Sequence, residues 1–147
     1  MMCRNRDEKD GSDMDAHGGM VIDTEKLDWR ELAPGVGIKV LRLDKESGAW
    51  TIMIKSEAGS VLPPHRHEGL SEIYILKGAG RHEEAGEFKA GDYVIEPDGA
   101  THSPLFFTEE VVQIMFAQGP SAFLAEDGSV AFMMDVEMLE RFAGQAA

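Results

Sequence analysis

The chain of 147 residues has little of what marks membrane, secreted or disulfide-linked proteins. Cys3 is the only cysteine, which excludes an internal disulfide and is typical of proteins in a reducing cytoplasm. No apolar run approaches the roughly 18 residues that a membrane-spanning helix needs. The first residues also lack the apolar stretch of a secretory signal. We therefore expect a cytoplasmic protein without a membrane segment.

Positive charge is scarce as well. The chain has 14 lysines and arginines against 27 aspartates and glutamates, and its formal net charge is -13. Such a surface repels phosphate backbones and anionic lipids, so neither nucleic acid nor a membrane is an expected partner. The acidic surface does not indicate a substrate, and solubility alone explains it.

The length allows one domain with a sizeable core and hardly two. Residues 1–20 are polar, contain glycine and show no periodicity, so they predict a flexible N-terminal tail. His17 lies in this tail, and we interpret it as a solvated histidine. We expect residues 21–147 to form the single folded domain.

Many short strand candidates separated by Gly/Pro turns predict an all-β sandwich or barrel. Residues 49–55 alternate, with Trp50, Ile52 and Ile54 on one face. Residues 111–117 are a nearly continuous apolar run, which favours a buried strand. Residues 121–124 and 129–133 indicate a hairpin. The stretch from Asp135 to residue 142 has a helical apolar stripe with Asp135 as its N-cap, so a short helix should end the domain.

Three of the five histidines lie where they could share one site. His65 and His67 are two residues apart, so in a strand both side chains face the same way and Arg66 faces the other. His102 follows the turn-rich sequence PDG at residues 97–99. Two imidazoles from one strand and a third from a later segment can hold a metal with open coordination positions. We interpret His82, which belongs to neither segment, as solvated or partly packed.

The same residues carry a resemblance to a known family. Gly59 with His65-x-His67 resembles the start of the first cupin motif, and Gly91 with PDG and His102 resembles the second, in the family's order and separation. The resemblance narrows the fold to a single-domain cupin jelly-roll β-barrel with a short C-terminal helix. The stretches SGAWTIMI, HRHEGLSEIYILKG and FLAEDGSV are similar to one cupin branch, the acetylacetone-cleaving and dihydroxyacetophenone-dioxygenase-like enzymes. That similarity covers most of residues 35–140.

Members of that branch hold iron(II) with three histidines and no carboxylate. The resemblance therefore implies His65, His67 and His102 as ligands of a divalent metal, with Fe(II) the expected ion and Zn or Ni as alternatives. Glu96, six positions before His102, is the candidate catalytic side chain, which would orient a ligand or a water. An exposed carboxylate at a strand end is the competing interpretation of Glu96.

Glu72 is an open question at this point. In the commonest cupin pattern, a glutamate four or five positions after the second histidine is a fourth ligand, and Glu72 is five positions after His67. The motif closes at Gly78, which is one residue closer to Glu72 than the pattern expects. Counting back from Gly78 therefore places Ser71 at the ligand position instead. A slip of one residue turns a side chain to the other face of a strand. Counting forward from His67 makes Glu72 a candidate metal ligand. Counting back from Gly78 excludes it.

The function implied by the resemblance is that of an iron-dependent dioxygenase. Such an enzyme would use O₂ to cleave a carbon–carbon bond of a small β-diketone or hydroxyketone. The alternatives are a non-catalytic metal-binding or sensor cupin, similar to the sensor-like domain of anti-sigma-factor proteins, and a cupin isomerase or sugar-binding protein. Small cupins often pair through apolar strands, so we expect a homodimer or a higher homo-oligomer.

Overall fold

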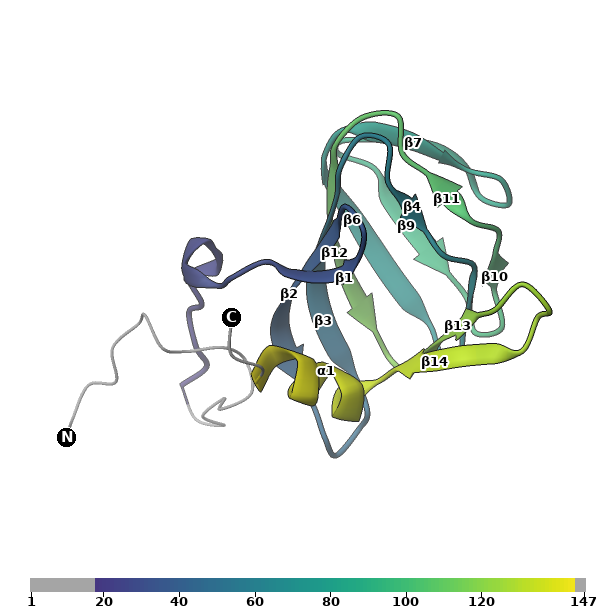
Figure 1. The fold of residues 1–147 in the computed structure, drawn as a ribbon. Coiled ribbons are helices and arrows are strands. Elements are labelled where there is room, and N and C mark those ends of the chain that lie inside the picture. The colour runs from purple at the N-terminus through teal and green to yellow at the C-terminus, as the bar shows by residue number, and fades with distance from the viewer. Residues whose placement is uncertain (1–17, 145–147) are drawn as a thin grey trace.

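The computed structural model describes residues 18–144 (Figure 1). The predicted N-terminal tail, up to residue 17, lies outside the described residues and stays a prediction. Nearly all regular secondary structure of the described chain is β-strand, with a short 3₁₀ turn, η3 (Thr24–Lys26), before the strands and one helix, α1 (Val136–Gly144), after them. Within this part of the chain, no helix is long and apolar enough to cross a membrane.

One layer is a six-stranded antiparallel sheet. Its inward face is built by alternation: in its third strand, Trp50, Ile52 and Ile54 are buried, as their spacing predicts, while their neighbours are half-buried. The prediction of a buried strand at residues 111–117 was right for one face only, because Phe116 on the other face is 45% exposed. The strand order is β1 (Arg30–Ala33), β2 (Val36–Leu43), β3 (Trp50–Ser56), β12 (Val111–Ala117), β6 (Ser71–Lys77) and β9 (Tyr93–Glu96).

The opposing layer consists of shorter strands. The predicted hairpin near the C-terminus is present and supplies two of the four strands of its main sheet. That sheet has the order β10 (Thr101–His102), β5 (His65–His67), β13 (Ser121–Leu124) and β14 (Val130–Met134). Two further pairs extend the layer: β4 (Val61–Leu62) with β11 (Leu105–Phe106), and β7 (Ala79–His82) with β8 (Gly86–Lys89).

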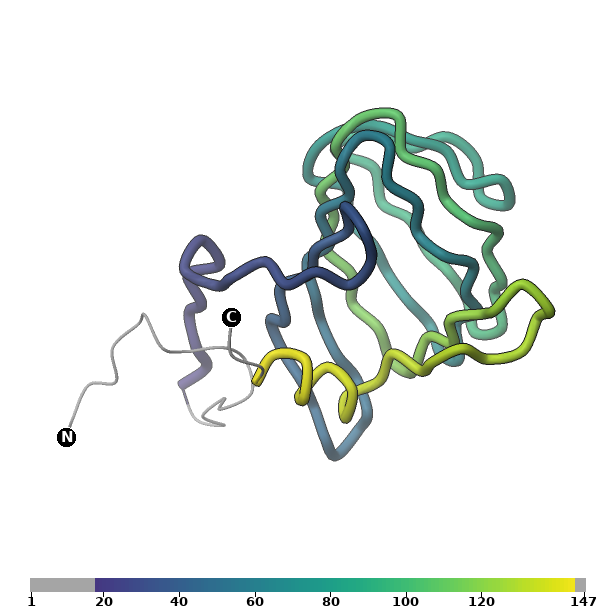
Figure 2. The backbone as a smooth tube through the Cα atoms, viewed as in Figure 1, coloured from purple at the N-terminus to yellow at the C-terminus, as the bar shows by residue number. Residues whose placement is uncertain are grey.

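The two layers face each other and enclose one core, as the path of the backbone shows (Figure 2). This confirms the predicted all-β jelly roll with a short C-terminal helix, although the sheets form an open sandwich and not a closed barrel. Asp135 is the helix N-cap, as predicted, because its Oδ1 accepts a hydrogen bond of 2.8 Å from the backbone N–H of Met138. The helix buries Leu139 completely in the core.

The outer face of the large sheet carries exposed apolar side chains. Tyr74, Tyr93, Ile95 and Phe116 are all between 44% and 58% exposed, and their strands β6, β9 and β12 are neighbours. Exposed apolar patches of this kind are common at interfaces between subunits. The homo-oligomer expected from the sequence stays a prediction, which sedimentation velocity can decide.

Candidate metal centre

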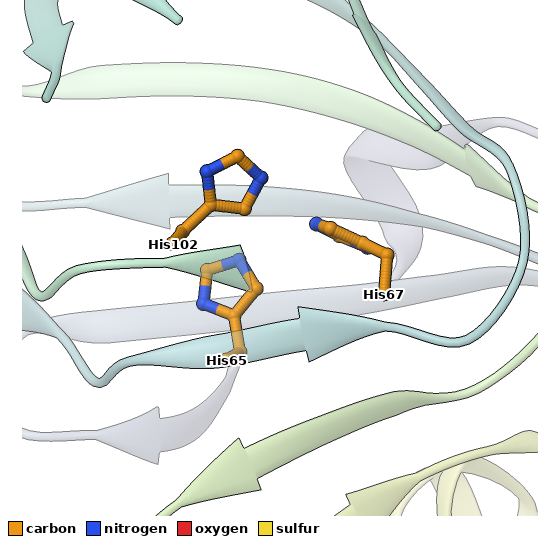
Figure 3. Close-up of side chains that lie close together, drawn as sticks. All are labelled: His65, His67 and His102. Carbon is orange, nitrogen blue, oxygen red and sulfur yellow. The ribbon is translucent and has the colours of Figure 1, made fainter. Parts of the chain in front are cut away.

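Strand β5 presents two histidines to the interior. His65 and His67 are 4% and 0% exposed, whereas Arg66 between them is on the other face and pairs with Glu68 at 3.0 Å. The alternation predicted from the HRH sequence is therefore present. Strand β10 pairs antiparallel with β5 and places His102 directly opposite His65. Two segments far apart in the sequence thus bring three imidazoles to one place (Figure 3).

The three rings surround a common point. Their centroids lie 5.0 to 5.1 Å apart, and one ring nitrogen from each lies within 4.8 Å of the others. Figure 3 shows the three rings directed toward one another from β5 and β10. Nitrogen atoms at this spacing can bind a single first-row divalent cation.

Contacts outside the cluster orient two of the rings. Nδ1 of His65 lies 3.0 Å from the carbonyl oxygen of Pro63, to which it donates. Nδ1 of His67 lies 3.2 Å from Oγ of Ser71 and 3.4 Å from Oγ of Ser121. Both rings are therefore held on their Nδ1 side, and Nε2 faces the cluster. Metal-binding histidines in proteins are held by outer partners in this way.

A carboxylate completes the polar cluster. Glu96, at the end of β9, is 2% exposed, so the interpretation as an exposed strand-end carboxylate was wrong. Its Oε2 lies 2.5 Å from Nε2 of His67, and its Oε1 lies 3.2 Å from Nε2 of His102. Within the described chain, both carboxylate oxygens are buried without a hydrogen-bond partner.

Buried polar atoms without partners are concentrated at this point of the described chain. They include Nε2 of His67, both ring nitrogens of His102 and both oxygens of Glu96. Native proteins pair nearly all buried polar atoms, since each unpaired one costs about 1–3 kcal/mol. A cation bound by the imidazoles would satisfy several of these atoms at once, so the residues present fit a divalent metal.

Burial and mutual proximity set the protonation states of the cluster. Burial is the largest influence on the pKa of His65 and lowers it to about 4, against a smaller opposing effect of the Pro63 carbonyl. Burial alone would raise the pKa of Glu96 and lower that of His102. Their proximity reverses both effects: the pKa of Glu96, which also lies beside His67, is held below its usual range, and that of His102 is raised. At neutral pH His65 is therefore uncharged, the form that binds metal, and Glu96 is ionised.

Comparison with known proteins agrees with this arrangement. The family model described as the ChrR cupin-like domain matches residues 17–122, well over half of the chain. The chain belongs to this cupin family. The cupin is also 31% identical over 101 residues to the acetylacetone-cleaving enzyme of Acinetobacter johnsonii, an alignment that covers 65% of this chain and 66% of that enzyme, just under two thirds of its length.

Solved structures share the fold of this cupin. A candidate acetylacetone dioxygenase from Methylibium petroleiphilum PM1 superposes with a TM-score of 0.81 at 23% identity, covering 89% of this chain and 98% of that one. The acetylacetone dioxygenase of Acinetobacter johnsonii gives a TM-score of 0.77 at 23% identity, with 97% of each chain covered. The resemblance to acetylacetone-cleaving cupins, inferred from the stretches SGAWTIMI, HRHEGLSEIYILKG and FLAEDGSV, is confirmed.

The structure answers the question about Glu72 against ligation. Ser71 is buried and lies directly opposite Glu96 in the pairing of β6 with β9, so Ser71 faces the cluster. Glu72 is on the other face of β6, where its cross-strand neighbours are Phe116 and Ile95 of the outer surface. The interpretation of Glu72 as a metal ligand is therefore wrong. The count back from Gly78, which places Ser71 at the ligand position, agrees with the structure.

His82 is a member of the cluster that the sequence did not reveal. It ends β7, is 5% exposed, and its ring centroid lies 5.0 Å from that of His102. Its Nε2 lies 3.8 Å from Oε1 of Glu96. The interpretation of His82 as solvated or partly packed was therefore wrong. A weak signal existed, because alternation in the short strand puts exposed Arg81 outward and His82 inward, but no motif marks the position.

The cluster also has a partner at its solvent edge. Glu84, just beyond β7, accepts hydrogen bonds from the backbone N–H and the hydroxyl of Ser103 at 2.9 and 2.6 Å. These bonds hold the pKa of the Glu84 carboxyl at about 2, so it is ionised. Its Oε2 lies 3.8 Å from Nδ1 of His102. An ionised carboxylate on this side of the ring favours a proton on Nδ1 and leaves Nε2 as the ligand atom.

Ser71→Ala should weaken metal binding without unfolding the protein. The change removes the nearer hydroxyl at Nδ1 of His67 and leaves only Ser121 at 3.4 Å, so the ring is held less firmly. Loss of such outer contacts typically costs about 10–100-fold in metal affinity, and we expect the lower end. Competition of the metal-loaded protein with a chelator measures the change. Glu72→Gln, one residue away on the opposite face, is the matched control and should bind metal as the unmodified protein does.

Proposed function

We propose that this cupin is a metal-dependent dioxygenase, with Fe(II) as the metal, that cleaves a carbon–carbon bond of a small β-diketone or hydroxyketone with O₂. The observation that carries the proposal is the convergence of three buried imidazoles, at least two with Nε2 held toward one point, beside a buried carboxylate. The similarity to an acetylacetone-cleaving enzyme supports the choice of substrate class.

The charges of the site suit this chemistry. Imidazoles are neutral when they bind a metal, so three of them leave a divalent ion its full charge, which favours a substrate that binds as an anion, such as the enolate of a β-diketone. When bound, the metal would supply Lewis acidity and a template that brings enolate and O₂ together. His65, His67 and His102 would hold it.

Glu96 would act beside the ligands and not as one of the three. Its carboxylate lies 2.5 Å from Nε2 of His67 and 3.2 Å from Nε2 of His102. Because these two imidazoles keep the carboxylate ionised against the effect of burial, Glu96 is suited to orient them and a polar substrate group rather than to hold a proton. We assign it a positioning role in the reaction.

Oxygen consumption tests the proposal. Protein stripped of metal and reloaded anaerobically with Fe(II) should consume O₂ when acetylacetone or another small diketone is added. Both oxygen atoms would enter the two fragments, giving one carboxylic acid and one vicinal dicarbonyl product for each O₂. The same protein reloaded with Zn(II) is the control and should consume none. Absence of uptake with every diketone and hydroxyketone offered would overturn the proposal.

A non-catalytic metal-binding or sensor cupin is the second candidate. The family description supports it, since the matching model is named after ChrR, and ChrR of Rhodobacter sphaeroides is an anti-sigma protein that forms a complex with SigE. That function predicts tight, stoichiometric metal without O₂ uptake, and binding to a protein partner. The oxygen measurement therefore separates the two candidates, while the three-histidine site serves both.

A further inference from the structure

The metal centre contains one imidazole more than the three-histidine set uses. His82 reaches the cluster from the β7–β8 hairpin and not from either histidine-bearing strand of the motifs. Its side chain is 6% exposed, and its Nδ1 is buried without a hydrogen-bond partner in the described chain. One ligand atom from each of His82, Glu96 and His102 lies within 4.8 Å of the others.

We propose that His82, Glu96 and His102 form a second set of metal ligands that overlaps the first at His102. Two imidazoles and one carboxylate with open positions are the arrangement that many non-haem Fe(II) proteins use. The ligand is a first-row divalent cation. This inference goes beyond the proposed reaction, because it concerns where the ion is held and does not depend on what the ion catalyses.

The two sets should be alternatives for a single ion. A neutral imidazole has one nitrogen lone pair free for coordination, and the other nitrogen carries a proton. His102 therefore binds one cation at a time, and both sets require it. We expect one divalent ion per chain, held by the three-histidine set in the unmodified protein and by the second set when the first is damaged.

The sets differ in the charge that they leave on the ion. The three-histidine set is neutral, while the second set contributes the negative charge of Glu96 and reduces the charge of a divalent complex to +1.

An aromatic side chain packs beside His82. The ring of Phe88 lies 5.4 Å from it. Phe88 pairs with Gly80 across the hairpin and packs over the glycine, since a Cβ at Gly80 would come 2.5 Å from Cζ of Phe88. The aromatic ring thus fills the space that a side chain at position 80 would occupy, on the same face of β7 as His82.

Cobalt titration of metal-free variants tests the proposal. Co(II) is followed by its visible absorption, and circular dichroism confirms that each variant is folded. His65→Ala should still bind one Co(II) per chain, about 10–100-fold more weakly than the unmodified protein. His65→Ala combined with His82→Ala should lose at least a further tenfold. Arg81→Ala in the His65→Ala background is the control for changes in β7 and should have no effect, because Arg81 is exposed.

Two outcomes would overturn the second set. One is equal affinity of His65→Ala with and without His82→Ala, which would show that the remaining ligands do not include His82. The other is complete loss of Co(II) from folded His65→Ala. If His65→Ala does not fold, His65→Gln replaces it in every comparison. These titrations measure Co(II) affinity without substrate and without turnover. Their result is therefore independent of whether the proposed dioxygenase reaction takes place.

Discussion

His102→Ala should abolish divalent-metal binding more completely than loss of any other single imidazole. The ring of His102 lies 5.1 Å from those of His65 and His67 and 5.0 Å from that of His82, so it belongs to both ligand sets. Its removal leaves no complete set of three. We expect affinity for Co(II) or Zn(II) to fall by more than about 100-fold, beyond the range typical of outer contacts, and O₂ uptake to disappear.

Isothermal titration of metal-free protein measures this loss. Thr101→Ala is the matched control, because Thr101 is the neighbouring residue of β10 and faces solvent. Thermal unfolding of the metal-free proteins separates lost ligands from a lost fold, since His102→Ala should unfold cooperatively near the temperature of the control. Retention of stoichiometric binding within a few fold of the unmodified protein would exclude His102 as the shared ligand.

The sequence was sufficient to predict the features of the site that depend on local alternation. The one-residue spacing of His65 and His67 places both on one face of any strand, and burial of both with Arg66 outside follows from that geometry. The motif pattern then supplied His102. What the motif could not supply is the cross-strand pairing that puts His102 opposite His65, since pairing of strands depends on the whole sheet.

Alternation left two kinds of residue undecided. For some it could not say which of two neighbours faces the core, and for others no motif residue nearby showed which face is the inner one. Glu72 and Ser71 are adjacent, so each frame buries one of them, and only the pairing of Ser71 with Glu96 decides between them. His82 lies in a four-residue strand outside both motifs, and its neighbours Glu96 and His102 come from β9 and β10. Periodicity indicates which way such a side chain faces but not what it meets.

The sequence also could not distinguish a sandwich from a barrel, because that difference depends on which strands pair. The number and spacing of short strands are the same in both architectures. Closure depends on hydrogen bonds between edge strands, and β1 and β9 at the two edges of the large sheet each pair on one side only. The candidate metal ligands lie on β5, β7, β9 and β10, so the site does not require the large sheet to close at β1.

Gly78→Ala should cause the largest loss of stability among single changes outside the core. Gly78 directly follows β6 and has φ +85°, a left-handed conformation that costs a residue with a side chain about 1–2 kcal/mol. A Cβ at this position would also overlap the backbone carbonyl oxygen of Glu110, just before β12. Backbone cannot yield as a flexible side chain can, so we expect the free energy of unfolding to fall by about 3 kcal/mol or more in urea denaturation.

Gly128→Ala separates the two causes. Gly128 has the same φ of +85°, yet a Cβ there would meet no atom within 4 Å. It should therefore lose only the conformational part, about 1–2 kcal/mol. The difference between the variants measures the close approach of Gly78 to Glu110, which fixes the distance between β6 and β12 at this end of the sheet. Equal losses would show that β12 shifts to admit the methyl group. In that case the contact between Gly78 and Glu110 would not hold β6 against β12. It would then not contribute to the position of Ser71 beside His67.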